Sequence, residues 1–520
     1  SLRRRQTPGF KALVSDLRAT PNTTPEDAEV AAQRYYDYFL DVCDLKVEAT
    51  ASHSVVRGST LPPIQKVFLF ARGGRTGRVY WTVYDETVPK DYAQSFWEPV
   101  PNLEEIEISR VIGAQYHNPN GHPIILLFLL GKEDSEKKLF LLTYRLSSRV
   151  GSGGEWSTAS PMTVANRISD WDALMVYGGD RSILPGVFVH GYCGYGDDNA
   201  FYGLKHSGPE WEGATGRKED FRWSWEPGPG GPFVGGLESY TPHYMCIDKV
   251  GSGVDRTWRR FRMFTFYEEK RRRNVLKVFN VFAPQTELLD ELELRGISNP
   301  DQKYIGFQEA SWDLQWPGTL HGVSYVRARD RWIYCYQMPA DERHTEPLFG
   351  VPWLTSTRLD DDPLDWLVGW FGADQSDLSR DGRSLSSIVF GSSANTPDGK
   401  AICYVTFRKC ADSPDEGIAP ELFLSKIRLD EEGLPSEVST DRVHLAPCVV
   451  VDMPVLNVLE NEHQDTRREK LNTAVDCNKD SPASSWTYLD EAYYYVPICI
   501  ALQLQTSGYF AEALDWFHKV

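Results

Sequence analysis

The chain has 520 residues and a formal net charge of −18, with 41% hydrophobic, 12% aromatic and 25% charged residues. This length exceeds one ordinary hydrophobic core, so we expect two to four domains. The acidic balance argues against nucleic acid as a partner, because phosphate binding requires clustered cations.

The first predicted element is a helix over residues 25–49. Thr24 is a good N-cap, Pro25 suits the first helical position, and Glu26 and Asp27 place acids in the first turn. Alanines and aromatic residues then form an apolar stripe as far as Cys43. We therefore predict an N-terminal helical segment over residues 1–60, with short strands from Pro62 onwards.

Paired apolar segments with turn residues between them predict a series of β-hairpins. The predicted strand pairs and single strands are 66–72 with 78–84, 111–116 with 124–130, 139–146, 187–189 with 201–205, 240–247 with 262–267, 275–282, 322–327 with 332–336, and 387–391 with 401–408. About six irregularly spaced units result, which is typical of propeller-like or sandwich-like antiparallel sheets. The sequence leaves the choice between these two architectures open.

The predicted organisation is therefore mainly β, with α-helical segments at both ends. A β domain begins over residues 61–150, a β-rich body with long loops covers 151–452, and a helical segment covers 453–520. In that last segment we expect one helix over Leu456–Leu471 and a final helix pair around Gly508, which is suited to a left-handed C-cap.

The final pair carries apolar stripes on both helices. Their members are Ile498, Leu502 and Leu504 on the first helix and Phe510, Leu514 and Phe517 on the second. Because Val520 lies inside the second helical pattern, we expect this sequence to be a piece of a longer polypeptide.

Three stretches, taken in order, resemble the A component of bacterial Tc toxin complexes. The first is Tyr35–Asp41 with the following Leu45–Glu48, and the second is Gly73–Tyr84 with Phe96–Val100 and the strand at Ile124–Leu130. The third contains Arg468–Thr473 and Tyr488–Phe517. These stretches cover about a third of the chain and are similar to the neuraminidase-like domain of that family and the helices around it.

The resemblance implies a non-enzymatic shell and receptor-facing part of a pore-forming insecticidal toxin subunit. It further implies a homo-pentamer, other Tc toxin subunits as partners, a cell-surface glycan or protein receptor, and a secreted or cell-surface location. Residues 1–8 lack the apolar stretch of a signal peptide, and no run of about 18 apolar residues predicts a membrane span. The alternative is a lectin or a sialidase-like β-propeller glycosidase.

The sequence singles out no catalytic residues. A sialidase needs three clustered arginines, a tyrosine nucleophile with a glutamate partner, and an acid/base aspartate. Arginines are abundant, but their spacing selects no triplet among Arg72, Arg75, Arg78, Arg110, Arg260 and Arg327. The segment Ser379–Ser384 is a single imperfect aspartate box that lacks its tryptophan. Salt-bridged structural arginines are the favoured interpretation.

No cofactor or metal site is predicted. The chain has neither a GxGxxG nor a GxSxG motif, and its nine cysteines form no CxxC pair, which favours a reduced, mostly buried set. His117 and His122 bracket a turn, with Asp134 further on, but a metal needs more ligands. The glycine-rich segment 189–198, with His190, Cys193, Asp197 and Asp198, is best interpreted as a loop.

Tryptophans in loop-like, Gly/Pro-rich surroundings are the best ligand-binding candidates. The apolar C–H faces of sugar rings stack on aromatic side chains, and neighbouring polar groups then fix the hydroxyls. The glycan candidates are Trp211, Trp223, Trp225, Trp316 and Trp353. Core packing is the alternative role for most of them.

Overall fold

The structure is a computed structural model that describes residues 5–20, 22–55, 64–86, 88–117, 123–146, 154–161 and 481–520, together with the strands and short segments between 173 and 479. Side chains are described mainly in the segments before residue 162 and after residue 421.

The described strands form six antiparallel sheets, each built from one continuous stretch of chain. Sheet 1 contains β1 (Leu45–Val55), β2 (Ile64–Gly73), β3 (Val79–Asp85) and β4 (Glu98–Pro99). Sheet 2 contains β5 (Glu107–His117), β6 (Ile124–Glu133), β7 (Glu136–Arg145) and β8 (Glu155–Trp156), with β9 (Ser160–Pro161) paired to β7. Sheet 3 contains β10 (Ala173–Gly178), β11 (Val187–Tyr192), β12 (Ala200–Lys205) and β13 (Trp223–Ser224).

The last three sheets repeat this plan. Sheet 4 contains β14 (Tyr240–Val250), β15 (Thr257–Glu268), β16 (Arg273–Asn280) and β17 (Glu287–Leu294). Sheet 5 contains β18 (Thr319–Val326), β19 (Arg331–Gln337) and β20 (Phe349–Gly350). Sheet 6 contains β21 (Ser384–Phe390), β22 (Ala401–Lys409), β23 (Glu421–Leu429) and β24 (Pro435–His444).

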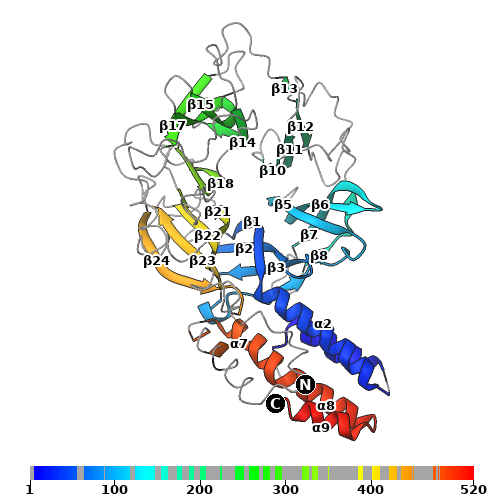
Figure 1. The fold of residues 1–520 in the computed structure, drawn as a ribbon. Coiled ribbons are helices and arrows are strands. Elements are labelled where there is room, and N and C mark those ends of the chain that lie inside the picture. The colour runs from blue at the N-terminus through cyan, green and yellow to red at the C-terminus, as the bar shows by residue number, and fades with distance from the viewer. Residues whose placement is uncertain are drawn as a thin grey trace.

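The six sheets follow one another around a ring, as the blades of a β-propeller do (Figure 1). The first strands of neighbouring sheets contact one another: β1 touches β5 and β21, β10 touches β5 and β14, and β18 touches β21. The first and last sheets are therefore neighbours. The β-rich, antiparallel architecture expected from the sequence is confirmed, and the predicted hairpins correspond to β2–β3, β5–β6, β11–β12, β14–β15, β18–β19 and β21–β22.

Helices from both ends of the described chain lie together beside sheets 1 and 6 (Figure 1). We call this group the terminal helices: α1 (Pro8–Ala19), α2 (Pro25–Cys43), α7 (Ala483–Asp490), the π-turn η8 (Glu491–Tyr495), α8 (Val496–Thr506) and α9 (Phe510–Phe517). Their buried residues share one core with Val67, Leu69 and Ala71 of sheet 1 and with Leu422, Leu424 and Val443 of sheet 6. A separate core joins sheets 1 and 2.

The local signals at the helix ends act as the sequence predicted. Thr24 and Asp27 form a reciprocal capping box, and Gly508 has φ of 91° with the Tyr509 amide bonded to the Leu504 carbonyl. The expected helix over residues 25–49 is too long, because it ends at Cys43 and Leu45 begins β1. Burial alternates from Leu45 to Ala51, so this segment has the period of a strand. The helix expected over 456–471 lies outside the described residues.

The final helix pair divides its apolar residues between the core and solvent. Leu504 and Trp516 are buried, whereas Leu502 is exposed. Phe510, Leu514 and Phe517 form the predicted stripe on α9 and are 68%, 53% and 37% exposed.

Candidate functional site

A buried polar network joins the three stretches of chain that carry the sequence resemblance. We call it the junction, and it consists of Tyr38 on α2, Trp97 before β4, Tyr488 on α7 and the carbonyl of Leu445 after β24. The Tyr38 hydroxyl donates to the Trp97 carbonyl at 2.7 Å, and the Trp97 amide donates to the Tyr488 hydroxyl at 2.9 Å. The two hydroxyls are 3.2 Å apart. Because the Tyr38 proton is already used, Tyr488 is the donor between them.

The indole of Trp97 extends the junction to sheet 6. Its Nε1 donates to the Leu445 carbonyl at 2.6 Å, and the Gln94 side-chain amide donates to the same oxygen at 2.7 Å. Trp97 is fully buried, and Tyr38 and Tyr488 are also buried. The junction therefore ties a helix near each end of the described chain to the edges of sheets 1 and 6.

Burial keeps the junction tyrosines protonated. Desolvation raises the pKa of Tyr38 well above its ordinary value, and the neighbouring Tyr488 adds to the effect. Burial also raises the pKa of Tyr488, although its hydrogen bonds to Tyr38 and Trp97 partly oppose the shift. These hydroxyls act as hydrogen-bonding groups between segments. A tyrosine nucleophile would instead need an accessible, activated oxygen.

The π-turn η8 is held by two contacts from the N-terminal helices. The Glu491 carboxylate is fully buried and accepts the Thr7 amide at 3.0 Å and the Thr7 hydroxyl. The Val496 amide bonds to the Glu491 carbonyl, so the next donor in this i→i−5 pattern would be residue 497. Pro497 has no N–H, and the Tyr36 hydroxyl donates to the Ala492 carbonyl at 3.0 Å in its place.

Asp41 anchors the β2–β3 turn to helix α2. Its carboxylate accepts the Arg75 amide at 3.2 Å, the Thr76 amide at 3.0 Å, the Tyr80 hydroxyl at 2.9 Å and the Thr76 hydroxyl. A Cβ on Gly73 would lie 2.5 Å from the Asp41 carboxyl carbon, so only glycine allows this approach. Residues 74–76, which lie within the resembling stretch Gly73–Tyr84, therefore form a turn that the Asp41 side chain holds.

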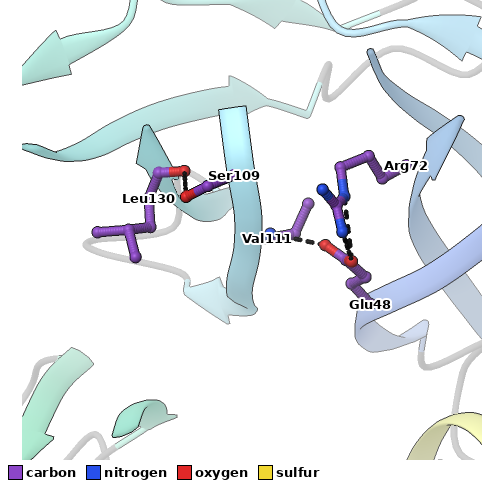
Figure 2. A network of polar contacts seen from close by, with 5 residues as sticks. All are labelled: Glu48, Arg72, Ser109, Val111 and Leu130. Carbon is purple, nitrogen blue, oxygen red and sulfur yellow. Dashed lines mark hydrogen bonds and ion pairs between the residues drawn. The ribbon is translucent and has the colours of Figure 1, made fainter. Parts of the chain in front are cut away.

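Glu48 joins sheets 1 and 2 (Figure 2). One carboxylate oxygen pairs with Arg72 at 2.8 Å, and the other accepts the backbone amide of Val111 in β5 at 2.8 Å. Glu48 is on β1 and Arg72 is on β2, so the ion pair bridges two strands of sheet 1. The bond from Glu48 to the Val111 amide then joins sheet 1 to sheet 2. Arg72, one of the arginines considered for a sialidase triplet, thus has a structural partner.

The glycan candidates fall mostly where the structure gives no description. Trp223 lies in β13, opposite Phe201 of β12. Trp211, Trp225, Trp316 and Trp353 lie outside the described residues. Of the five candidates, only Trp223 has a described position, and the role of all five in glycan binding stays a prediction.

The other sequence candidates are placed only in part. His117 ends β5, His190 lies in β11, and Asp134 occupies the β6–β7 turn with φ of 50°. His122, Cys193, Asp197 and Asp198 are outside the described residues. Among the residues that are described, no group of three His, Cys, Asp or Glu side chains could hold a metal ion, and no helix is long and apolar enough to cross a membrane.

Sequence reasoning missed the residues of the junction as a group. Tyr38, Trp97 and Tyr488 each lie in a stretch that carries the resemblance, but nothing in their spacing predicts contact over 391 residues. The one usable signal was that aromatic residues with a polar atom recur in all three stretches.

Comparisons with known proteins give little that bears on this arrangement. No family model and no curated protein matches the chain. Two solved structures of a variant lectin from Aleuria aurantia, one with alpha-methyl-L-fucoside and one with Fucalpha1-6GlcNAc, are 12% identical. Each alignment covers 78% of this chain and 97% of the lectin, with TM-scores of 0.37 and 0.35. Similarity at this level indicates neither a shared ligand nor a shared fold.

Proposed function

We propose that this chain is a non-enzymatic shell and receptor-facing part of a pore-forming toxin subunit of the Tc A-component kind. In this role it binds the surface of a target cell and supports toxin translocation by its partner subunits. We further propose that the β-rich part of the chain is a six-bladed β-propeller. The order of the six sheets and the contacts between their first strands support this architecture.

The observation that carries the proposal is the junction. Three stretches chosen from the sequence because they resemble one family meet through Tyr38, Trp97 and Tyr488. Motifs matched by chance have no reason to be in contact across hundreds of residues. The three side chains are buried, and the two tyrosine hydroxyls bond to each other and to the backbone of Trp97. What the chain would share with that family is therefore a supporting framework.

The position of the ring supports a receptor-facing role for the opposite side. The terminal helices lie beside sheets 1 and 6, whereas β13, which contains Trp223, lies across the ring from them (Figure 1). If the terminal helices attach this chain to the rest of a toxin subunit, the side of the ring that contains β13 is free to contact a cell. Glycan recognition through the tryptophan candidates is one form that this contact could take.

A sialoside assay combined with a glycan array tests the proposal against its alternative. The purified chain is incubated with a chromogenic sialoside, with a known sialidase as the positive control, and is then applied to the array. We expect no turnover. Hydrolysis above the no-protein blank would overturn the non-enzymatic role and favour a sialidase-like propeller.

The array separates the two kinds of receptor. Binding that is lost in Trp223→Ala and kept in Tyr92→Ala supports glycan recognition by the candidate face, because Tyr92 is half exposed in a turn that contacts α7. Absence of glycan binding, with binding to whole target cells retained, supports a protein receptor. Absence of both contradicts the receptor-facing role.

A further inference from the structure

The ring of sheets has one seam that the chain does not cross directly. Each sheet consists of consecutive strands, so the chain itself connects sheet 1 to sheet 2 and so on as far as sheet 6. Sheets 6 and 1 are neighbours through β21 and β1, but they lie at opposite ends of the strand order. No strand is exchanged between them in the described part of the chain. Among the described residues, non-covalent contacts hold this seam.

Two side chains bridge the seam at the level of the sheets. Gln94 and Trp97, which lie between β3 and β4, both donate to the carbonyl of Leu445, the residue after β24. All three residues are buried. Loss of these bonds would leave buried donors without partners, which is costly in a protein interior.

The terminal helices bridge the same seam a second time. Helix α2 ends one residue before β1 and therefore moves with sheet 1. Helices α7 to α9 follow sheet 6 in the chain, and α8 packs on both α1 and α2. Hydrogen bonds that join the two sets include Thr7 with Glu491, Tyr36 with the Ala492 carbonyl, and Thr23 with Gln503, in addition to the contact between the Tyr38 and Tyr488 hydroxyls.

We propose that the terminal helices are a clasp that holds the ring of sheets shut, so that releasing them opens the seam between β1 and β21 before any other. Helices bound to each other hold the first and last sheets at a high effective concentration, which favours their contact. Each remaining seam keeps a covalent connection and does not need the clasp. The ring is therefore a strip of sheets closed by its ends, with one built-in opening site.

Tyr36 is the residue through which this clasp can be weakened most selectively. Its hydroxyl satisfies a carbonyl that Pro497 cannot serve, and this bond joins α2 to the π-turn η8. Tyr36→Phe removes this one oxygen and keeps the buried ring. Gln503→Ala removes a half-buried bond to Thr23 and is a milder second variant.

Hydrogen exchange measured by mass spectrometry on the full chain tests the proposal, with Glu48→Ala as the matched control at the seam between sheets 1 and 2. Tyr36→Phe should speed exchange in β21 by about tenfold while leaving β10 unchanged, and Gln503→Ala should act on the same strand to a smaller extent. Glu48→Ala should instead affect β5, where Val111 loses its acceptor.

Three results would overturn the clasp. Exchange in β21 could stay at the wild-type rate in both Tyr36→Phe and Gln503→Ala. All six sheets could exchange faster by the same factor, which would indicate general destabilisation. Glu48→Ala could also open β21 as strongly as Tyr36→Phe, and the seam between β1 and β21 would then have no special dependence on the terminal helices.

Discussion

Removing the Tyr488 hydroxyl should destabilise the protein through a single unpaired amide. In Tyr488→Phe the amide of the fully buried Trp97 loses the Tyr488 hydroxyl as its acceptor, while Tyr38 keeps its bond to the Trp97 carbonyl. A buried donor without a partner costs about 1–3 kcal/mol. This corresponds to a change of roughly 5- to 150-fold in the unfolding equilibrium.

Urea unfolding followed by circular dichroism and tryptophan fluorescence measures this loss as a lower midpoint at constant slope. Tyr494→Phe is the matched control, because Tyr494 is 49% exposed on the π-turn η8 that directly follows α7. We expect the control to stay within about 0.5 kcal/mol of the wild type. Equal midpoints for the two variants would refute the inference that the junction contributes to stability.

Three further predictions follow from the same contacts. Asp41→Asn should lower the free energy of unfolding by about 1–3 kcal/mol in urea titrations, because an amide cannot accept all the donors that converge on this carboxylate. Leu514→Glu should change the free energy of unfolding by less than about 0.5 kcal/mol, because Leu514 is exposed. Leu504→Ala should lower it by about 2–5 kcal/mol, because Leu504 is buried. Equal effects of the two variants would contradict the described orientation of the helix pair. The raised pKa values of Tyr38 and Tyr488 predict that the protein is destabilised in alkali. The contribution of these tyrosines to the free energy of unfolding is full below the ordinary tyrosine pKa of 10.0 and is lost as the pH rises from there towards the folded-state pKa. The loss is up to about 1.4 kcal/mol per pH unit for each tyrosine. Unfolding midpoints between pH 8 and 11 measure this loss, and a flat profile would contradict the burial of these hydroxyls.

Local patterns were enough to predict much of the sheet structure. The hairpins follow from alternating apolar residues and strong turn residues, which act over a few positions. The capping box at Thr24 and the glycine cap at Gly508 are local for the same reason. The end of α2 was missed because the apolar stripe continues into β1, where Val47 and Ala49 suit either period over so short a run.

The ring and the junction could not be predicted from one sequence. Closure of sheet 6 on sheet 1 depends on contacts between β1 and β21, which are more than 300 residues apart in the chain. The bonds of Trp97 to Leu445 and Tyr488 are equally distant, and a single sequence carries no signal for such pairs. The chemistry of the junction is recognisable only when burial and direction of each side chain are known.

Binding of the fluorescently labelled chain to cultured insect cells, quantified by flow cytometry, tests the central claim most directly. A receptor-facing toxin part should bind in a saturable way, and an excess of unlabelled chain should compete with it. The Tyr494→Phe variant should bind as the wild type does. Signal no higher than that of a labelled protein of similar size and charge would contradict the proposed function.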